Sequence, residues 1–459
     1  MMLYKSLKLT KKLYLAIKSL FLNIFLKIFN LIYIFNPKSY KYFTQIFKIY
    51  SSTINLDLND DVSKIRIILK TFSSLNKSHL KYHHKIILFN FILKFCKIHI
   101  NKKFLEKYFY LISNKELATK NQIQLIKIVK NYYEDDLYSF IMLKKISYAL
   151  GLYRFSFYLR LFLEKNVLKL NNQKKNLIFK FNVSLFSNNE KAFKTAAEKL
   201  NQILFFNRNC KVFNPNECYS FFFQKKKFSQ SIYWNSKDLE YKDIIQNKRV
   251  AIVGPSNSLL KQREEIDDYD VVVRMNQEAP LEKSLGDYAG TKTDINYFGG
   301  GLIHSRKKKV FDFINSSNLQ FICFKDQNTS DKFNLSKIKS KSRQWLEFPW
   351  SFECSHMMVQ NILLDLLCFS PKTIKLFNVD FYLGKKKYMS DKYKVGIFSR
   401  SPVFDLHDPY VNYRIVKFLY EQGFIEVDPN VKKILKYSNH SYIKILEDVN
   451  RESAFNLVY

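Results

Sequence analysis

The chain has 459 residues, enough for two or three domains, and its 47% hydrophobic and 17% aromatic residues can bury a sizeable core. The formal charge of +35 favours anionic partners, namely nucleic acid, anionic lipid or a phosphorylated substrate. Part of this surplus fits an AT-rich genome, because Lys, Asn, Ile, Phe and Tyr are abundant together. None of the six cysteines forms a C-x-x-C pair, which excludes that zinc pattern and predicts buried free thiols in a reducing compartment.

The first 40 residues predict a basic amphipathic segment. Its apolar run from Leu13 to Phe35 is interrupted by Lys18 and Lys27, and charges at mid-bilayer are costly. We therefore expect a helix that lies on an anionic membrane surface, with an ordinary buried helix and a true span as the alternatives. The run is not a signal peptide, since no small-residue cleavage site follows it.

Glycine and proline divide the rest of the chain. Of ten glycines only Gly151 precedes Gly254, and of nine prolines only Pro37 and Pro215 precede Pro255. Helix interiors exclude both residues, whereas α/β turns need them. We therefore expect an α-helical module at 41–240, with one faint helical-repeat signal, and an α/β domain at 241–459.

Apolar residues recur at spacings of three and four through the helical module. They predict helices at Ile65–Phe72, His84–Ile100, Gln122–Tyr133, Leu137–Leu163, Asn176–Phe186 and Glu190–Phe206. Residues 207–246 are expected to form an irregular connector.

The α/β domain opens with a predicted strand, Val250–Val253, a turn at Gly254, and a helix over Leu259–Glu265. Ser256 lies in the turn. A strand, a tight turn and a helix start would place backbone N–H groups and hydroxyls at the carboxyl edge of a sheet, where a phosphate can bind.

The neighbouring strand is expected at Val271–Val273, with Arg274 and Asn276 emerging at the same edge. Asp380 follows a later strand at its carboxyl end, where such sheets place site residues. The remaining expected elements are a loop at Gly286–Asp294, strands at Ile295–Phe298, Leu319–Phe324, Thr373–Val379 and Ile425–Val427, and helices at Ser355–Phe369, Pro409–Gln422 and Pro429–Leu435. This alternation predicts an α/β fold with a mostly parallel sheet and helices on both faces.

Several of these segments carry a family resemblance. Their order and spacing are similar to the large sialyl motif of family 29 glycosyltransferases, the animal-type sialyltransferases, in Val250-Ala-Ile-Val-Gly-x-Ser, Glu265-Ile-Asp267, Val273-Arg-Met-Asn-Gln277 and Gly290-Thr-Lys-Thr293. The segment around Ser355 resembles the small sialyl motif, and His407-Asp408 resembles the very small motif. The resemblance covers roughly residues 246–440.

The resemblance implies a Rossmann-like variant of the nucleotide-sugar transferase fold. It implies an inverting transfer of sialic acid from a CMP-sugar donor to a glycan hydroxyl, with no metal and no cofactor. Carried over by position, Gly254, Ser256 and Asn276 would adjoin the CMP part of the donor. Ser355 and His356 would contact the nucleotide from the other side, and His407 would be the catalytic base.

The residue types suit this chemistry. An imidazole with a pKa near neutrality can take the proton from the acceptor hydroxyl. The phosphate of the leaving CMP can be stabilised by N–H groups, amides and a basic residue such as Arg274.

The chain departs from the family pattern at Pro255 and Asn257 in the first turn, at Cys354-Ser-His356 and at Asn412. Asn257 could compensate for the altered turn, and a related nonulosonic acid could replace sialic acid. Two alternatives stay open: a transferase for another CMP-activated acidic sugar, and a non-enzymatic basic protein that binds nucleic acid or anionic lipid.

The lack of a signal, the cysteine usage and the basic start predict a cytoplasmic protein, peripheral on the inner face of a membrane. The expected acceptor is a glycan or glycolipid, such as a lipid-linked capsule or lipopolysaccharide precursor. Nucleic acid is not the expected partner of the transferase.

Overall fold

A computed structural model of the chain divides into two compact units, Met1–Leu150 with Ala454–Tyr459, and Gly151–Ser453. The boundary expected near residue 240 therefore lies inside the second unit. The residues that the structure describes are 64, 68, 69, 71–73, 75, 76, 82–96, 98, 102–113, 137–167, 174–187, 189–204, 214–224, 226, 234–256, 260–281, 283–324, 341–345, 357–384 and 408–458.

The described part of the first unit is helical, with α4 (Tyr82–Phe95), α5 (Lys102–Ser113) and α7 (Leu137–Ala149). Its core contains three phenylalanine rings with centroids 5.3–5.8 Å apart, those of Phe72, Phe89 and Phe109. The helix expected at 122–133 and the amphipathic segment at 1–40 lie outside the described residues. Among the helices that are described, none has the length and apolar character needed to cross a membrane.

The second unit begins with α8 (Tyr153–Val167), α9 (Lys174–Phe186) and α10 (Glu190–Leu204). The single helix expected over Leu137–Leu163 is therefore wrong. It is split between Ala149 and Tyr153, where Gly151 has a φ of 80°. Glycine adopts this left-handed conformation without a steric cost, so it ends one helix and lets the next begin.

The irregular connector expected at 207–246 is also wrong in part, because α11 (Pro215–Gln224) and α12 (Ser236–Ile245) lie within it. α12 begins with a capping box in which Asn235 and Asp238 exchange side-chain-to-backbone hydrogen bonds. α11 is held by aromatic packing, with the ring of Phe221 stacked 4.5 Å from that of Phe424. The described cysteines, Cys96, Cys218, Cys323 and Cys368, are buried free thiols as expected.

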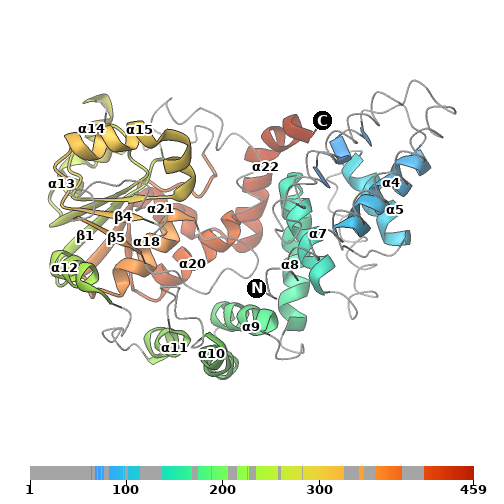
Figure 1. The fold of residues 1–459 in the computed structure, drawn as a ribbon, viewed down its shortest axis with the longest axis horizontal. Helices are drawn as coiled ribbons and strands as arrows, with labels where there is room; N and C mark the ends of the chain where they lie inside the picture. The colour runs from blue at the N-terminus through green and yellow to red at the C-terminus, as the bar shows by residue number, and fades with distance from the viewer. Residues whose placement is uncertain are drawn as a thin grey trace, which may run out of the picture. The chain divides into compact units, whose positions relative to one another are not determined.

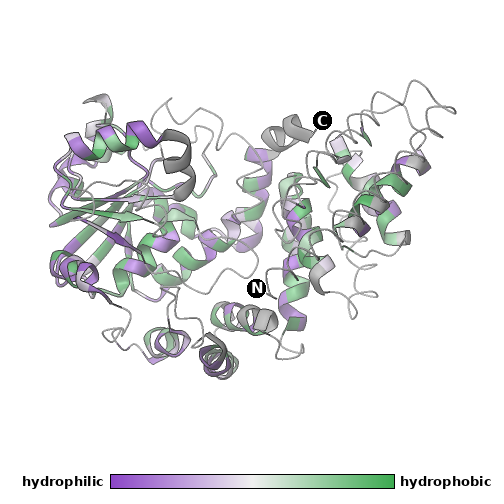
Figure 2. Cartoon of the chain, viewed as in Figure 1, coloured by the Kyte–Doolittle hydropathy of each residue, from purple (hydrophilic) through white to green (hydrophobic). Residues whose placement is uncertain are grey.

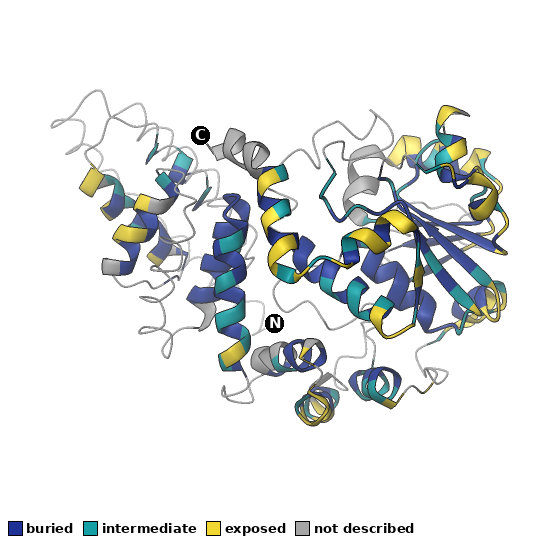
Figure 3. Ribbon diagram, turned by 180° about the vertical axis from the view of Figure 1, so that it is seen from behind, coloured by how far each residue is buried: buried dark blue, intermediate teal, exposed yellow. Residues whose placement is uncertain are grey.

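A seven-stranded, all-parallel sheet follows, which confirms the expected α/β class (Figure 1). Its strand order is β5-β4-β3-β2-β1-β6-β7. The strands are β1 (Arg249–Val253), β2 (Val271–Met275), β3 (Ile295–Phe298), β4 (Phe321–Phe324), β5 (Ser342–Gln344), β6 (Thr373–Phe377) and β7 (Glu426–Val427). β1 to β4 are buried along almost their whole length, because helices cover both faces (Figure 3).

The two faces of the sheet are covered by different helices. On one face lie α13 (Arg263–Asp267), α14 (Lys283–Ala289) and α15 (Gly300–Ser316), whose apolar residues pack on alternate strand positions such as Ala251, Val272 and Phe298. On the other face lie α12 and α18 (Met358–Leu367) (Figure 1). The covering helices α12 and α14 carry both hydrophobic and hydrophilic residues, whereas α18 is mainly hydrophobic (Figure 2).

The remaining helices are α20 (Pro409–Glu421), α21 (Pro429–Leu435) and α22 (Asn439–Val458). Several elements differ from the sequence expectations. The helix expected at Leu259–Glu265 begins only at Arg263, α14 occupies part of the expected loop at Gly286–Asp294, and α15, β5 and α22 were not expected.

Candidate functional site

The direction of the chain through the sheet reverses at β1. From β1 the chain moves outward through β2, β3, β4 and β5, and then returns to place β6 and β7 on the other side of β1. Val253 and Phe377, the last residues of β1 and β6, are partners in register. In open α/β sheets, ligands bind at such a switch point, beyond the carboxyl ends of the two strands. The candidate site is therefore the region formed by the loops after β1 and β6 and by their neighbours at the same edge.

Gly254 allows these two loops to approach each other closely. Its N–H donates to the carbonyl of Phe377 at 2.8 Å. A Cβ at this position would lie 2.4 Å from the carbonyl oxygen of Asn378 and 2.5 Å from Cγ2 of Val379, which is too close for any other residue. The glycine expected at a phosphate turn is thus required by contact between two backbone segments.

Ser256 and Asp380 are brought together across the switch point. The N–H of Asp380 donates to Oγ of Ser256 at 3.0 Å, and the N–H of Ser256 donates to the carbonyl of Asn378 at 3.1 Å. Ser256 and Asp380, two of the residues predicted to contact the donor, are 124 positions apart in the sequence and lie in one hydrogen-bonded pair of loops at the carboxyl edge.

The carboxylate of Asp380 organises the turn that follows it. Its Oδ1 accepts from the N–H of Tyr382 at 3.0 Å and its Oδ2 from the N–H of Gly384 at 3.2 Å. Phe381 and Tyr382 have φ values of 49° and 65°, a left-handed conformation that costs about 1–3 kcal/mol for each such residue. Burial raises the pKa of Asp380, while the N–H of Tyr382 and the hydroxyl of Ser256 oppose that shift.

Asn276 lies at the same edge, directly after β2, with a φ of 52°. Its Oδ1 accepts from the N–H of Gly299 at 2.8 Å, at the start of α15. A Cβ on Gly299 would lie 3.5 Å from Sδ of Met358, the first residue of α18. The side chain of the first residue of α18 therefore reaches Gly299, the cap of α15, beside Asn276. Both helices begin near this edge, and helix N-termini favour anionic groups.

The loop after β1 does not lead directly into a helix. Gln262 precedes α13, where its N–H donates to the carbonyl of Asp287 at 3.0 Å and its Nε2 to Oδ1 of Asn378 at 3.3 Å. These bonds hold Gln262 in a non-helical conformation and delay the helix to Arg263. The phosphate-binding helix start expected near Leu259 is therefore wrong, and the helix N-termini at this edge belong to α15 and α18.

Arg274 has a structural role in its described contacts. Its Nε donates to the carbonyl of Lys292 at 3.1 Å and to Oγ1 of Thr293 at 2.9 Å, and its Nη2 donates to the carbonyls of Ala289 and Gly290 at 2.8 and 3.1 Å. These bonds attach the end of β2 to the loop before β3. A contact between Arg274 and a phosphate stays a prediction.

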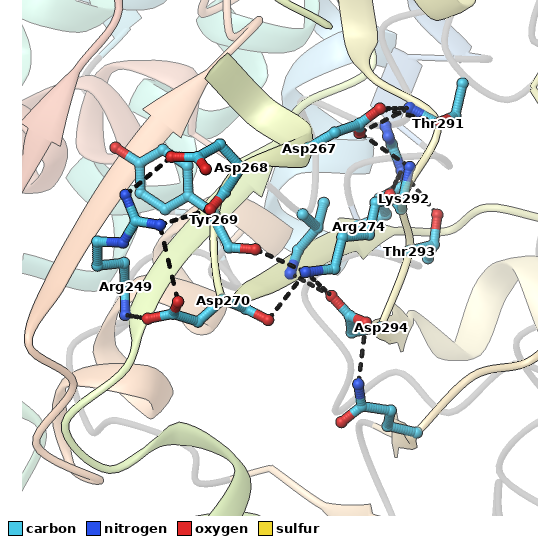
Figure 4. A network of polar contacts seen from close by, with 12 residues as sticks. Arg249, Asp267, Asp268, Tyr269, Asp270, Arg274, Thr291, Lys292, Thr293 and Asp294 are labelled. Carbon is cyan, nitrogen blue, oxygen red and sulfur yellow. Dashed lines mark hydrogen bonds and ion pairs between the residues drawn. The ribbon is translucent and has the colours of Figure 1, made fainter. Parts of the chain in front are cut away.

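Asp267 connects the segment before β2 with the loop before β3, both of which belong to the expected large sialyl motif (Figure 4). Its carboxylate accepts from the N–H groups of Thr291 and Lys292, at 2.8 and 3.0 Å, and from Oγ1 of Thr291 at 2.9 Å. Gly290 has a φ of 68°, and a Cβ there would lie 2.5 Å from Oδ1 of Asp267. The hydrogen bonds of Asp267 therefore position the loop before β3, and this contact accounts for the spacing between Asp267 and Gly290 in the motif.

Lys292 and Asp294 continue this network at the amino ends of the strands (Figure 4). Nζ of Lys292 donates to the carbonyls of Tyr269 and Asp270 at 2.6 and 2.9 Å. Asp294 accepts from the N–H of Val272 at 2.7 Å. These bonds attach the amino end of β2 to the segment before β3. Among the described residues, no group of three or more His, Cys, Asp or Glu is placed to hold a metal ion.

A buried ionic network lies on the face covered by α12 and α18. Nε of Arg343 in β5 donates to Asp238 at 2.8 Å, and its Nη1 donates to Asp365 at 2.6 Å, with all three side chains fully buried. Tyr297 donates to the same Asp365 oxygen at 2.6 Å and is hydrogen-bonded to Tyr241 at 2.7 Å. No sequence motif indicated this network, because its members come from four separate elements.

Four of the residues expected at the site, Asn257, Ser355, His356 and His407, lie outside the described residues. The structure does describe Asp408, the residue after His407. Asp408 caps α20 by accepting from the N–H of Tyr410 at 3.0 Å. The described residues Gly254, Ser256, Asn276 and Asp380 all lie at the carboxyl edge of β1, β2 and β6.

This edge has three features that favour an anionic ligand, namely a switch point, two helix N-termini and two strands followed by residues with left-handed backbone. Comparison of the chain with protein-family models and with curated proteins found no match.

Proposed function

We propose that the protein is an inverting, metal-independent glycosyltransferase with a Rossmann-like domain. It moves sialic acid, or a related nonulosonic acid, from a CMP-sugar to a hydroxyl of a glycan acceptor. The proposal rests on the resemblance of residues 246–440 to family 29 glycosyltransferases. The seven-stranded parallel sheet is compatible with the fold that this resemblance implies.

The observation that carries the proposal is the contact between Ser256 and Asp380 at the switch point. Ser256 comes from the large-motif segment, and Asp380 follows the strand of the small-motif segment. Asn276, also from the large motif, lies at the same edge beside the starts of α15 and α18. A CMP phosphate at this place would meet N–H groups and the positive ends of two helices.

In the proposed mechanism His407 takes the proton from the acceptor hydroxyl as that oxygen attacks the anomeric carbon of the donor sugar. The bond from this carbon to the CMP phosphate breaks, and the sugar passes through an oxocarbenium-like state. Fixed N–H groups and helix ends stabilise the charge that develops on the leaving phosphate.

The test is an assay of the purified protein with CMP-sialic acid, a broad panel of glycan acceptors and EDTA. We expect acceptor-dependent release of CMP that persists in EDTA and is lost in His407→Ala. Lack of CMP release across the panel, or a strict need for a divalent metal, would contradict the proposal.

The donor alternatives are separated by thermal unfolding in the presence of nucleotides. A ligand that binds the folded state raises its melting temperature, by an amount that grows with ligand concentration. We expect CMP to stabilise the protein more than UDP or GDP does. If CMP stabilises it but CMP-sialic acid is not consumed, the donor is another CMP-activated acidic sugar.

The net charge of +35 supports the second candidate function, a non-enzymatic protein that binds anionic lipid or nucleic acid. That function predicts binding that weakens steeply with salt and does not change in His407→Ala.

For the enzyme, we propose a place on the inner face of a membrane, where the basic segment at 1–40 would contact anionic lipid and the acceptor would be a glycolipid.

A further inference from the structure

Helix α8 is joined to the carboxyl-terminal helices by three ion pairs within the second unit. Arg154 pairs with Glu447 at 2.6 Å, Arg160 with Asp408 at 2.9 Å, and Glu164 with Arg414 at 2.5 Å. The ring of Phe157 lies between them, 5.1 Å from that of Tyr410 and 5.0 Å from that of His440. α8 therefore packs on α20 and α22, although it precedes the sheet by many residues.

The pair between Arg160 and Asp408 is the most enclosed of those that reach the start of α20. Both side chains are only 7% exposed. The two carboxylate oxygens of Asp408 have different partners, since Oδ1 accepts from the N–H of Tyr410 and Oδ2 accepts from Nη2 of Arg160. The guanidinium of Arg160 also lies 5.7 Å above the ring of Tyr410. The first turn of α20 is thus fixed from within by its cap and from outside by Arg160.

We infer that Arg160 is a positioning residue for His407, an inference that rests on the proposed function. His407 is joined to Asp408 by a peptide bond, so the ion pair fixes the chain directly after the proposed base. Without Arg160, the buried carboxylate of Asp408 loses this ion pair at 2.9 Å, and the start of α20 can shift. A displacement of about 1 Å at a catalytic group can lower a rate about 100-fold.

The test compares Arg160→Ala, Arg160→Lys and Asp408→Asn in the full chain. Asn keeps the cap of α20 while it removes the charge that Arg160 contacts. The matched control is Arg154→Ala, which removes an ion pair from the same helix at the partner residue Glu447. With CMP-sialic acid as donor, we expect Arg160→Ala and Asp408→Asn to lower kcat by about 10- to 100-fold, with little change in KM for the donor.

Three further results are expected. Arg160→Lys should have a higher kcat than Arg160→Ala. The double variant Arg160→Ala with Asp408→Asn should be no slower than the slower of the two single variants. Arg154→Ala should keep kcat near the wild-type value. Thermal unfolding of each variant shows whether it is folded at the assay temperature. Equal kcat values for Arg160→Ala and Arg154→Ala would overturn the inference.

A second readout does not depend on turnover. The ring resonance of His407 is assigned in histidine-labelled protein by its absence from His407→Ala, among the eight histidines of the chain. We expect Arg160→Ala and Asp408→Asn to move this resonance and Arg154→Ala to leave it in place. If the wild type releases no CMP, the proposed function fails, whereas an unmoved His407 resonance in Arg160→Ala overturns the positioning role itself.

Discussion

At the scale of single residues, contact between two backbone segments accounts for the glycine in the first turn. From the sequence, we expected Gly254 to form a tight turn near a bound phosphate. The structure shows that the neighbouring β6 loop already leaves no space for a side chain there. Such a contact joins residues 254 and 378, and no local pattern in either segment could indicate it.

Gly254→Ala should destabilise the protein by about 1–3 kcal/mol, because the added methyl group would force the two loops apart. Gly299→Ala is the matched control, since a Cβ at Gly299 meets nothing closer than 3.5 Å and its φ is −74°. Urea unfolding measures both free energies. Equal stability of the two variants would show that the β1 and β6 loops do not approach as described.

Asp380 gives a prediction about pH. Burial raises its pKa in the folded state above the ordinary value of 3.8. As pH rises through 3.8, the unfolded chain releases this proton first, so the unfolded state is favoured by about 1.4 kcal/mol per pH unit until the folded carboxyl also ionises. The stability of the wild type relative to Asp380→Asn should therefore be constant below this window and fall across it.

The measurement is urea unfolding of both proteins at a series of pH values. The difference between the two free energies isolates the carboxyl group, because every other titrating group is shared. A difference that rises with pH across the window would mean that the folded state favours the charged form of Asp380.

At the scale of elements, the apolar strands were predictable and the polar ones were not. β1, β2 and β3 are continuous apolar runs, as a parallel sheet with two covered faces requires. β5 is Ser342-Arg-Gln344, which no hydrophobic pattern marks as a buried strand. It is buried because Asp238 and Asp365 neutralise Arg343, and these residues come from distant helices.

Arg343→Met should destabilise the protein by about 3–5 kcal/mol, because it leaves two buried carboxylates without their cation. Arg249→Met is the control, since Arg249 pairs with Asp268 and Asp270 at the surface, where solvent screens ion pairs and they contribute little to stability. Thermal or urea unfolding separates the two cases. If Arg343→Met is no less stable than Arg249→Met, the buried network does not hold β5 in place.

At the scale of the whole molecule, the composition of the chain predicted two classes of structure but placed their boundary differently. The scarcity of glycine and proline predicts that the chain before Gly254 is helical. The described elements α8 to α12 of this part are indeed all helices. They nevertheless share a compact unit with the sheet. Composition reports the kind of element, whereas the ion pairs and ring contacts that join elements depend on residues far apart in the sequence.

A fragment of residues 241–459 should therefore fold poorly compared with a fragment of residues 151–453. The shorter fragment cuts α12, loses Asp238 as a partner of Arg343, and loses the contacts of α8 with α20. Denaturant unfolding followed by circular dichroism compares the two. A cooperative transition in 241–459 at the same midpoint as in 151–453 would contradict the division at residue 150.

We propose that the carboxyl edge between β1 and β6 binds the CMP part of a sugar donor. A crystal structure of the complex with CMP tests it most directly. We expect the phosphate beside Ser256 and Asn276, near the starts of α15 and α18, with the ring of His407 facing the same site. CMP bound elsewhere, or a His407 ring packed among apolar side chains away from the first loop, would contradict it.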